Sequence, residues 1–305
     1  MTRPGAEPRP TLLLEPAPLA AYLGAHLVLA VETFQHTGSF KFRAAWNVAG
    51  NVPNPHVIAA SSGNFGQAIA LACRIFGKRC TVVMPETSAR VKVEAVRAYG
   101  GDVDLINVRV KGRAARVREL AEQHPDAYIA SAYDDRLVIE GNATLGRELA
   151  SANPPFDAVV VPVGGGGLSA GVIIGLEESG NQARVFGAEP LQANDAARSL
   201  RAGRIIANER EPDTLADGAR TISVGQHNWP ILQRGLSAIF EIPEHDIIQA
   251  VQLLFRYANL KAEPTGALSV AALLPRPPEL RGKRVCCVVS GGNVDSNVYR
   301  ELLGA

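Results

Sequence analysis

A lysine between two aromatic residues is the first feature of this chain that suggests chemistry. Lys41 lies between Phe40 and Phe42 and follows the small polar residues of 37–39. Burial among aromatic rings would lower the lysine pKa, which makes the neutral amine available as a nucleophile or base. The alternative is a surface lysine at the start of a helix, with its stem on apolar surface and its charge in water. Taken alone, the segment favours the surface lysine.

Three short apolar runs, each typical of a buried strand, end in a turn of glycines or small polar residues. The turns are Ser-Ser-Gly-Asn at 61–64, four glycines at 164–167 and Ser-Gly-Gly-Asn at 290–293. In open α/β sheets the ligand binds at the carboxyl ends of the strands. The first two turns lead into predicted helices, so their N–H groups offer anion sites. Four consecutive glycines allow a phosphate to approach the backbone closely.

A reactive lysine, a phosphate site and a second anion site together fit pyridoxal phosphate, whose substrate is an amino acid with a carboxylate. The alternative is a dinucleotide fold, because a strand, a glycine loop, a helix and a strand ending in Glu189 follow one another. No Gly-x-Gly-x-x-Gly register fits, since Ser169 or Ala170 occupies the last glycine position. The dinucleotide fold also leaves Lys41 unexplained.

Helical and strand patterns alternate along most of the chain, which predicts an α/β protein with parallel sheets. The expected strands are 27–31, 57–60, 80–84, 103–108, 128–130, 158–163, 184–189 and 285–289. We expect a helix or ordered arm over 11–25 and an irregular segment over 196–230. Two open twisted α/β sheets then form a large domain of 1–52 and 135–305 and a small domain of 53–134.

Composition excludes several classes of partner. The 305 residues have a net charge of +1, with 47% hydrophobic and 20% charged residues. This balance gives no reason to expect a nucleic acid or an anionic membrane as partner. There is no signal-peptide pattern and no apolar run of about eighteen residues. The four cysteines lack Cys-x-x-Cys spacing, so we expect a reduced, cytoplasmic protein.

Six motifs in order resemble the fold-type II pyridoxal-phosphate enzymes, which share a tryptophan synthase β-like fold. The resemblance covers nearly the whole chain and is strongest to the serine racemase and serine/threonine dehydratase (threonine ammonia-lyase) branch. The motifs are 37–43, 61–66, 161–167, 216–218, 263–265 and 290–293. The resemblance implies that the cofactor lies between the domains and that Lys41 forms the internal Schiff base. It also implies three further groups of cofactor contacts: Gly164, Gly165, Gly166 and Gly167 to the phosphate, Asn64 to the ring hydroxyl, and Ser290 to the pyridine nitrogen.

The resemblance also assigns the substrate to the first turn. The implied substrate-binding residues are Ser61, Ser62, Gly63, Asn64 and Phe65. Ser62 would be a second acid/base on the face opposite Lys41, as racemisation requires; the alternative is a turn residue that caps the following helix. Phe65 replaces the histidine usual in the racemase-like branch, which leaves the identity of the substrate open.

Glu189, Ala193 and Asp195 match a divalent-metal site of the racemase-like branch. Two carboxylates and a carbonyl would suit Mg²⁺ or Ca²⁺; the alternative is a solvated acidic turn. A homodimer is a further implication of the resemblance.

The expected activity is elimination of a β-hydroxy amino acid to a 2-oxo acid and ammonia. Threonine, serine, hydroxyaspartate and phenylserine remain unranked as substrates. An amino-acid racemase, on its own or in the same active site, is the second hypothesis. A catalytically silent cofactor-binding protein is the third, and the presence of both Lys41 and Ser62 argues against it.

Overall fold

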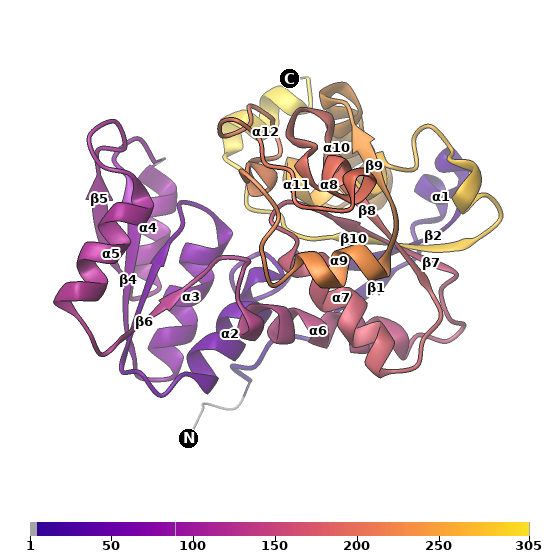
Figure 1. The fold of residues 1–305 in the computed structure, drawn as a ribbon. Coiled ribbons are helices and arrows are strands. Elements are labelled where there is room, and N and C mark those ends of the chain that lie inside the picture. Colours follow the sequence, from indigo (N-terminus) through magenta and orange to yellow (C-terminus); the bar gives the residue numbers. More distant parts are fainter. Residues whose placement is uncertain (1–4, 89, 305) are drawn as a thin grey trace.

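The computed structural model describes residues 5–88 and 90–304. Residues 1–4 and 305, which we assigned to the large domain, lie outside this range. The strands form two sheets, and helices pack on both faces of each (Figure 1). None of the described helices combines the length and the apolar character needed to cross a membrane.

The larger sheet has six strands, and its central strands are apolar because helices cover both faces. Their order is β1 (Leu12–Leu14), β2 (His26–Val31), β10 (Arg284–Val289), β7 (Ala158–Pro162), β8 (Arg184–Pro190) and β9 (Leu236–Ile242). One face packs on α1 (Ala17–Leu23), α10 (Glu244–Ala258), α11 (Pro264–Ala271) and α12 (Ser296–Leu302). The other packs on α6 (Arg136–Ala150), α7 (Gly167–Glu178), α8 (Asp195–Ala202) and α9 (Trp229–Gly235). Short 3₁₀ turns cover Leu191–Ala193, Asp217–Ala219 and Pro278–Leu280.

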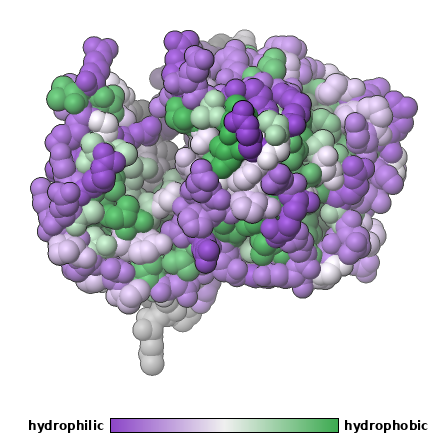
Figure 2. Space-filling view, viewed as in Figure 1, coloured by the Kyte–Doolittle hydropathy of each residue, from purple (hydrophilic) through white to green (hydrophobic). Residues whose placement is uncertain are grey.

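The smaller sheet has four parallel strands. Their order is β5 (Asp102–Ile106), β4 (Arg79–Pro85), β3 (His56–Ala60) and β6 (Ala127–Ala130). One face packs on α2 (Lys41–Asn51), α3 (Asn64–Ile75) and α4 (Arg90–Ala98), and the other on α5 (Arg113–Gln123). In Figure 1, α2 and α6 lie where the two sheet units meet, and Figure 2 shows a hollow in the surface between these units. The boundaries of the two domains stay a prediction.

The structure corrects two expectations about the elements and adds two elements that were not expected. The segment 196–230 is not irregular throughout, because α8 extends to Ala202 and α9 begins at Trp229. Charged residues obscured α8 in the sequence, although its buried face carries Ala196, Ala197 and Ser199. The arm over 11–25 divides into β1 and α1, and β1 pairs antiparallel with β2 whereas the other neighbouring strands of this sheet are parallel. Strand β9 and helix α12 were not predicted.

Candidate active site

The turn after β10 lies directly against the loop that leads to Lys41. Ser39 and Gly291 form an isolated antiparallel bridge, and the Phe40 amide donates a 3.0 Å hydrogen bond to the Ser290 carbonyl oxygen. These contacts join two segments about 250 residues apart in the sequence, because β2 and β10 are parallel neighbours whose carboxyl ends meet. Both Ser290 and Ser39 are buried.

Lys41 is the first residue of α2, and its amino group contacts the segment that follows β6. The Nζ atom donates a 2.6 Å hydrogen bond to the carbonyl oxygen of Ala132. It lies 5.0 Å from the centre of the Phe40 ring and 5.9 Å from that of Phe65. Burial lowers the Lys41 pKa from 10.5 to about 8, and the Glu263 carboxyl opposes this shift in part. The amino group therefore lies in the environment predicted for a reactive lysine.

The turn after β3 is organised by Ser61 rather than by Ser62. The Ser61 Oγ atom accepts hydrogen bonds from the amides of Gly63 at 3.4 Å and Gly66 at 3.1 Å, and so holds the start of α3. Ser61, and not Ser62, therefore caps the start of this helix. Ser62 remains partly exposed, whereas the Phe65 side chain is buried in the core of the smaller sheet.

The four glycines form a tight connection between β7 and α7. Gly166 has φ +89°, a conformation that favours glycine, and a Cβ on Gly165 would lie 2.2 Å from Cδ2 of Tyr133. The Gly165 carbonyl oxygen accepts hydrogen bonds from the Gly225 amide at 3.0 Å and the Asn228 side chain at 2.6 Å. These contacts fix the loop on one side, and its last glycine begins the twelve-residue helix α7, whose N-terminal amides are suited to an anion.

Glu263 is a site residue whose role the sequence did not reveal. Its buried carboxyl accepts a 2.7 Å hydrogen bond from the Asn64 side chain. Burial, with a smaller contribution from the nearby carboxylate of Asp217, raises the Glu263 pKa from 4.5 to about 8. In the sequence, residues 263–265 were recognised only as one of the six motifs that carry the family resemblance. An acidic residue that precedes a helix of mostly small and apolar residues was the available signal.

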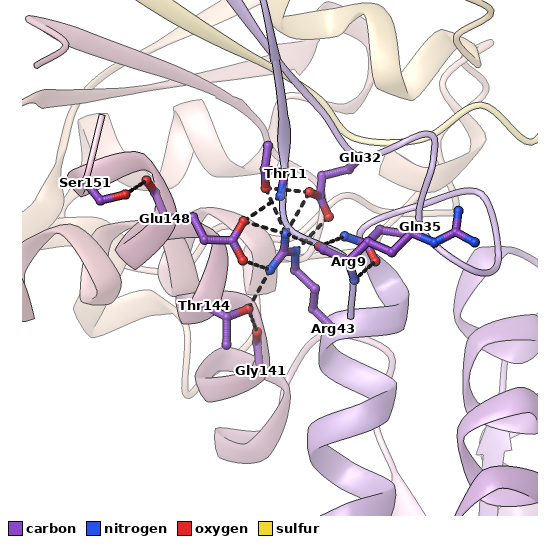
Figure 3. A network of polar contacts seen from close by, with 9 residues as sticks. All are labelled: Arg9, Thr11, Glu32, Gln35, Arg43, Gly141, Thr144, Glu148 and Ser151. Carbon is purple, nitrogen blue, oxygen red and sulfur yellow. Dashed lines mark hydrogen bonds and ion pairs between the residues drawn. The ribbon is translucent and has the colours of Figure 1, made fainter. Parts of the chain in front are cut away.

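The Arg43 side chain anchors the first turn of α2 through a network of polar contacts (Figure 3). Its guanidinium contacts the Glu32 carboxylate at 2.8 and 3.0 Å and the Glu148 carboxylate at 2.7 and 2.9 Å. Thr11 and Thr144 complete the set of side-chain partners, at 2.8 and 3.0 Å. These contacts raise the Arg43 pKa against the opposing effect of burial. The network ties α2 to β2 and α6 only two residues after Lys41.

Glu189 and Asp195 lie together in the interior of the larger sheet unit. Glu189 accepts hydrogen bonds from the amides of Ala196 at 3.0 Å and Ala197 at 2.9 Å, while Asp195 Oδ1 accepts one from Asn208 at 2.9 Å. Burial raises both carboxyl pKa values, that of Asp195 to about 7. Asp195 Oδ2 is buried and has no hydrogen-bond partner within 5–88 and 90–304. The alternative prediction of a solvated acidic turn is therefore wrong, because both side chains are buried.

Ala193, the third residue of the expected metal site, is also buried, at the end of a 3₁₀ turn. No group of three or more histidine, cysteine, aspartate or glutamate residues suited to a metal occurs among the residues that the structure describes. The pair therefore offers two carboxylates, and any further ligands would have to be carbonyl oxygens or waters.

A family model described as "Pyridoxal-phosphate dependent enzyme" matches residues 6–291. The chain belongs to this family. The match confirms the family resemblance and the α/β fold class, and it contradicts the dinucleotide alternative. In agreement with that result, both carboxylate oxygens of Glu189 accept hydrogen bonds from amides at the start of α8.

Several proteins resemble this pyridoxal-phosphate dependent enzyme over most of its length. An L-threo-3-hydroxyaspartate ammonia-lyase from Pseudomonas sp is 36% identical, covering 93% of this chain and 90% of its own. Serine racemase from Bos taurus is 35% identical, with 89% and 84% covered. Among solved structures, the threonine deaminase from T.th. has a TM-score of 0.88 and 40% identity, covering 94% of both chains. Maize serine racemase has a TM-score of 0.91 and 28% identity, with 96% and 91% covered.

The residues of this pyridoxal-phosphate dependent enzyme fit its cofactor. Thr37 Oγ1 and Ser39 Oγ are buried in the loop before Lys41, and neither has a hydrogen-bond partner among the described residues. A lysine with a lowered pKa can react with an aldehyde, and a glycine loop at a helix start can hold a phosphate. The chain thus has groups for both ends of pyridoxal phosphate.

Proposed function

We propose that this enzyme uses pyridoxal phosphate to eliminate the hydroxyl group of a β-hydroxy amino acid, giving a 2-oxo acid and ammonia. The observation that carries the proposal is the Lys41 amine, which has a pKa of about 8 and lies where the strand-end turns meet. The activities named for the relatives, elimination from 3-hydroxyaspartate and threonine and racemisation of serine, support the same class of substrate.

In this proposal the residues of the chain divide the work between binding and proton transfer. The bound cofactor supplies an electron sink for the bond broken at the substrate α-carbon. The glycines at 164–167 hold its phosphate, and the turn at 61–64 holds the substrate carboxylate. Lys41 removes the α-proton, and the β-hydroxyl is protonated and leaves as water. Hydrolysis of the resulting enamine by a water molecule gives the 2-oxo acid and ammonia. Ser290 presents a neutral hydroxyl to the pyridine nitrogen, which stabilises a protonated ring less than a carboxylate would and so favours prompt loss of the hydroxyl.

Amino-acid racemisation is the second candidate, and Ser62 supports it. Racemisation needs a second acid/base on the face of the substrate opposite Lys41. Ser61 holds the helix start, so the Ser62 hydroxyl is left for another role. Both reactions can begin with the same proton removal by Lys41, so one site can carry out both.

We also propose that Glu189, Asp195 and the Ala193 carbonyl bind Mg²⁺ or Ca²⁺. The support is chemical, since burial raises the pKa of both carboxyl groups and one oxygen lacks a partner among the described residues. A divalent cation would compensate both charges with the oxygen ligands that these ions prefer.

The enzyme is further proposed to be a cytoplasmic homodimer. Leu12 and Leu13 on the edge strand β1 are exposed, as is Phe34, and these apolar side chains would suit a subunit interface. All four cysteines are buried and unpaired, which agrees with a reducing compartment. Light scattering of the purified protein measures the oligomeric state directly.

A panel of β-hydroxy amino acids tests the proposal. Purified enzyme reconstituted with pyridoxal phosphate is incubated with threonine, serine, threo-3-hydroxyaspartate and phenylserine, with and without a chelator. Release of 2-oxo acid is measured enzymatically, and the enantiomers of the remaining substrate are separated by chiral chromatography. We expect stoichiometric 2-oxo acid and ammonia from at least one substrate. Enantiomer exchange without 2-oxo acid would favour the racemase, and a protein that binds cofactor but changes no substrate would be the silent binder.

A further inference from the structure

A chain of three polar side chains links the turns around the proposed cofactor site. The Asn293 Nδ2 atom lies 2.9 Å from Asn64 Oδ1, and Asn64 Nδ2 lies 2.7 Å from Glu263 Oε1. These residues follow β10, begin α3 and precede α11, respectively. These hydrogen-bonded side chains therefore connect parts of the two sheet units, and Asn64 is the central one.

The donor and acceptor roles within this chain are fixed by a main-chain carbonyl at one end. Asn293 Nδ2 also donates a 2.7 Å hydrogen bond to the carbonyl oxygen of Thr37. A carbonyl oxygen only accepts, so Asn293 must direct its amino group there, and that group donates both of its hydrogens. Asn64 must then present its oxygen to Asn293, which turns its own amino group to the opposite side.

At the other end, Glu263 receives the Asn64 amino group. The Glu263 carboxyl is held by close packing, because a Cβ on Gly291 would lie 2.3 Å from Glu263 Oε1. Asn293 is held in a similar way, since a Cβ on Gly38 would lie 2.2 Å from Asn293 Oδ1. One hydrogen of the Asn64 amino group points to Glu263, and the other remains available to a ligand.

We propose that Asn293 and Glu263 are positioning residues that fix the orientation of the Asn64 amide, so that its amino group meets the ring oxygen of the cofactor. The inference rests on the proposed function and on the role that the family resemblance implies for Asn64, a hydrogen bond to the ring hydroxyl of the cofactor. A fixed N–H donor stabilises an ionised ring oxygen, whereas the amide oxygen would repel it. The orientation of one amide thus selects the protonation state of the bound ring hydroxyl.

The variant Asn293→Asp tests the inference, because it keeps the shape of the side chain but removes both donors. Asn64 then turns its amino group toward residue 293 and its oxygen toward the cofactor and Glu263, whose carboxyl, with a pKa of about 8, can donate a hydrogen bond to that oxygen. We expect the Kd of the apo-enzyme for pyridoxal phosphate to rise about tenfold, and the pH at which the absorption of the bound cofactor changes to shift upward. Asn297→Asp makes the same change on the exposed start of α12 and should alter neither quantity.

The Asn64→Ala background shows whether the effect passes through Asn64. In that background Asn293→Asp should raise the Kd less than about twofold, because no amide is left to turn. An equal tenfold effect in both backgrounds would overturn the inference, as would an unchanged Kd in Asn293→Asp. If Asn293→Asp fails to fold, Asn293→Ala should still raise the Kd by about two- to fivefold, and an unchanged Kd would overturn it equally.

Glu263→Gln supplies the conservative variant at the other end. A glutamine oxygen can still accept from the Asn64 amino group, so we expect the cofactor Kd to stay within about threefold of the wild type. Glu263→Leu removes the acceptor and should behave like Asn293→Ala. Cofactor binding is measured without substrate, so a failure of this inference is distinct from a failure of the proposed reaction, which the release of 2-oxo acid by wild-type enzyme decides.

Discussion

The Lys41 amino group donates a 2.6 Å hydrogen bond to the carbonyl oxygen of Ala132, which follows β6 of the smaller sheet. The two residues are 91 positions apart in the sequence. A single carbonyl acceptor orients the amine without neutralising its charge, so burial lowers the Lys41 pKa to about 8. The hydrogen bond holds the amine in one position, and the lowered pKa allows the amine to act as a base near neutral pH.

Lys41→Ala should reduce 2-oxo acid release by at least about a thousandfold, because the group that removes the α-proton is lost. Lys111→Ala, which removes a partly exposed lysine paired with Glu119, is the matched control and should leave the rate unchanged. In wild-type protein, borohydride should fix the cofactor on the peptide containing Lys41, as measured by mass spectrometry. A label on another lysine would contradict the assignment.

The pH dependence of cofactor capture should follow the Lys41 pKa. Only the neutral amine attacks an aldehyde, so the rate of pyridoxal phosphate binding by apo-enzyme should rise with pH and level off above about 8. The same shift affects stability: between about 8 and 10.5 the unfolded chain binds a proton that the folded chain does not, so the free energy of unfolding contributed by Lys41 rises with pH there. Stopped-flow absorbance measures the rate, and a midpoint near 10.5 would contradict burial of the amine.

Arg43→Ala should lower the free energy of unfolding by about 3–5 kcal/mol, because it leaves the fully buried Glu32 carboxylate without its partner. Arg147 provides the control, since its contacts with Glu140 and Glu178 are exposed. Arg147→Ala should cost less than about 1 kcal/mol. Urea denaturation of the apo-proteins measures both changes, and equal losses would show that burial does not decide the strength of the Arg43 network.

Ser62→Ala and Ser61→Ala should differ in which of the two activities they reduce. The first should suppress any racemisation by about a hundredfold and leave elimination within about threefold of the wild type. The second should weaken both reactions, because the Ser61 hydroxyl organises the turn itself. Initial rates of 2-oxo acid release and enantiomer exchange, measured on the same substrate, separate the two cases. Equal loss of both activities in Ser62→Ala would argue against a second acid/base there.

Mg²⁺ or Ca²⁺ should raise the melting temperature of the enzyme by a few degrees if the cation binds at Glu189 and Asp195, since ligands of the native state stabilise it. Asp195→Asn should abolish this increase because it removes one of the two carboxylates. Asp126→Asn changes an exposed aspartate and should retain the increase. Differential scanning calorimetry with and without cation provides the measurement, and an identical response of both variants would exclude this site.

Local patterns predicted most of the elements because apolar runs and glycine breaks are local signals. The run 158–163 and its four glycines indicated β7 and the start of α7. Helix α8 was missed because its charged residues outnumber its large apolar ones. Its start is held by the buried Glu189 carboxylate, a tertiary contact that no local pattern shows. Tertiary packing, not propensity, stabilises that helix.

The sequence by itself determined the family, the cofactor and the segments that meet around it. A glycine loop, a lysine between aromatic residues and ordered strand-end turns are each read from neighbouring positions. Only the tertiary structure decided which of two adjacent serines organises the turn after β3, and that Glu263 lies against Asn64, 199 positions away. It also decided the Lys41 pKa, because burial depends on groups distant in the sequence, such as Phe65 and Glu263, as well as on the neighbouring Phe40.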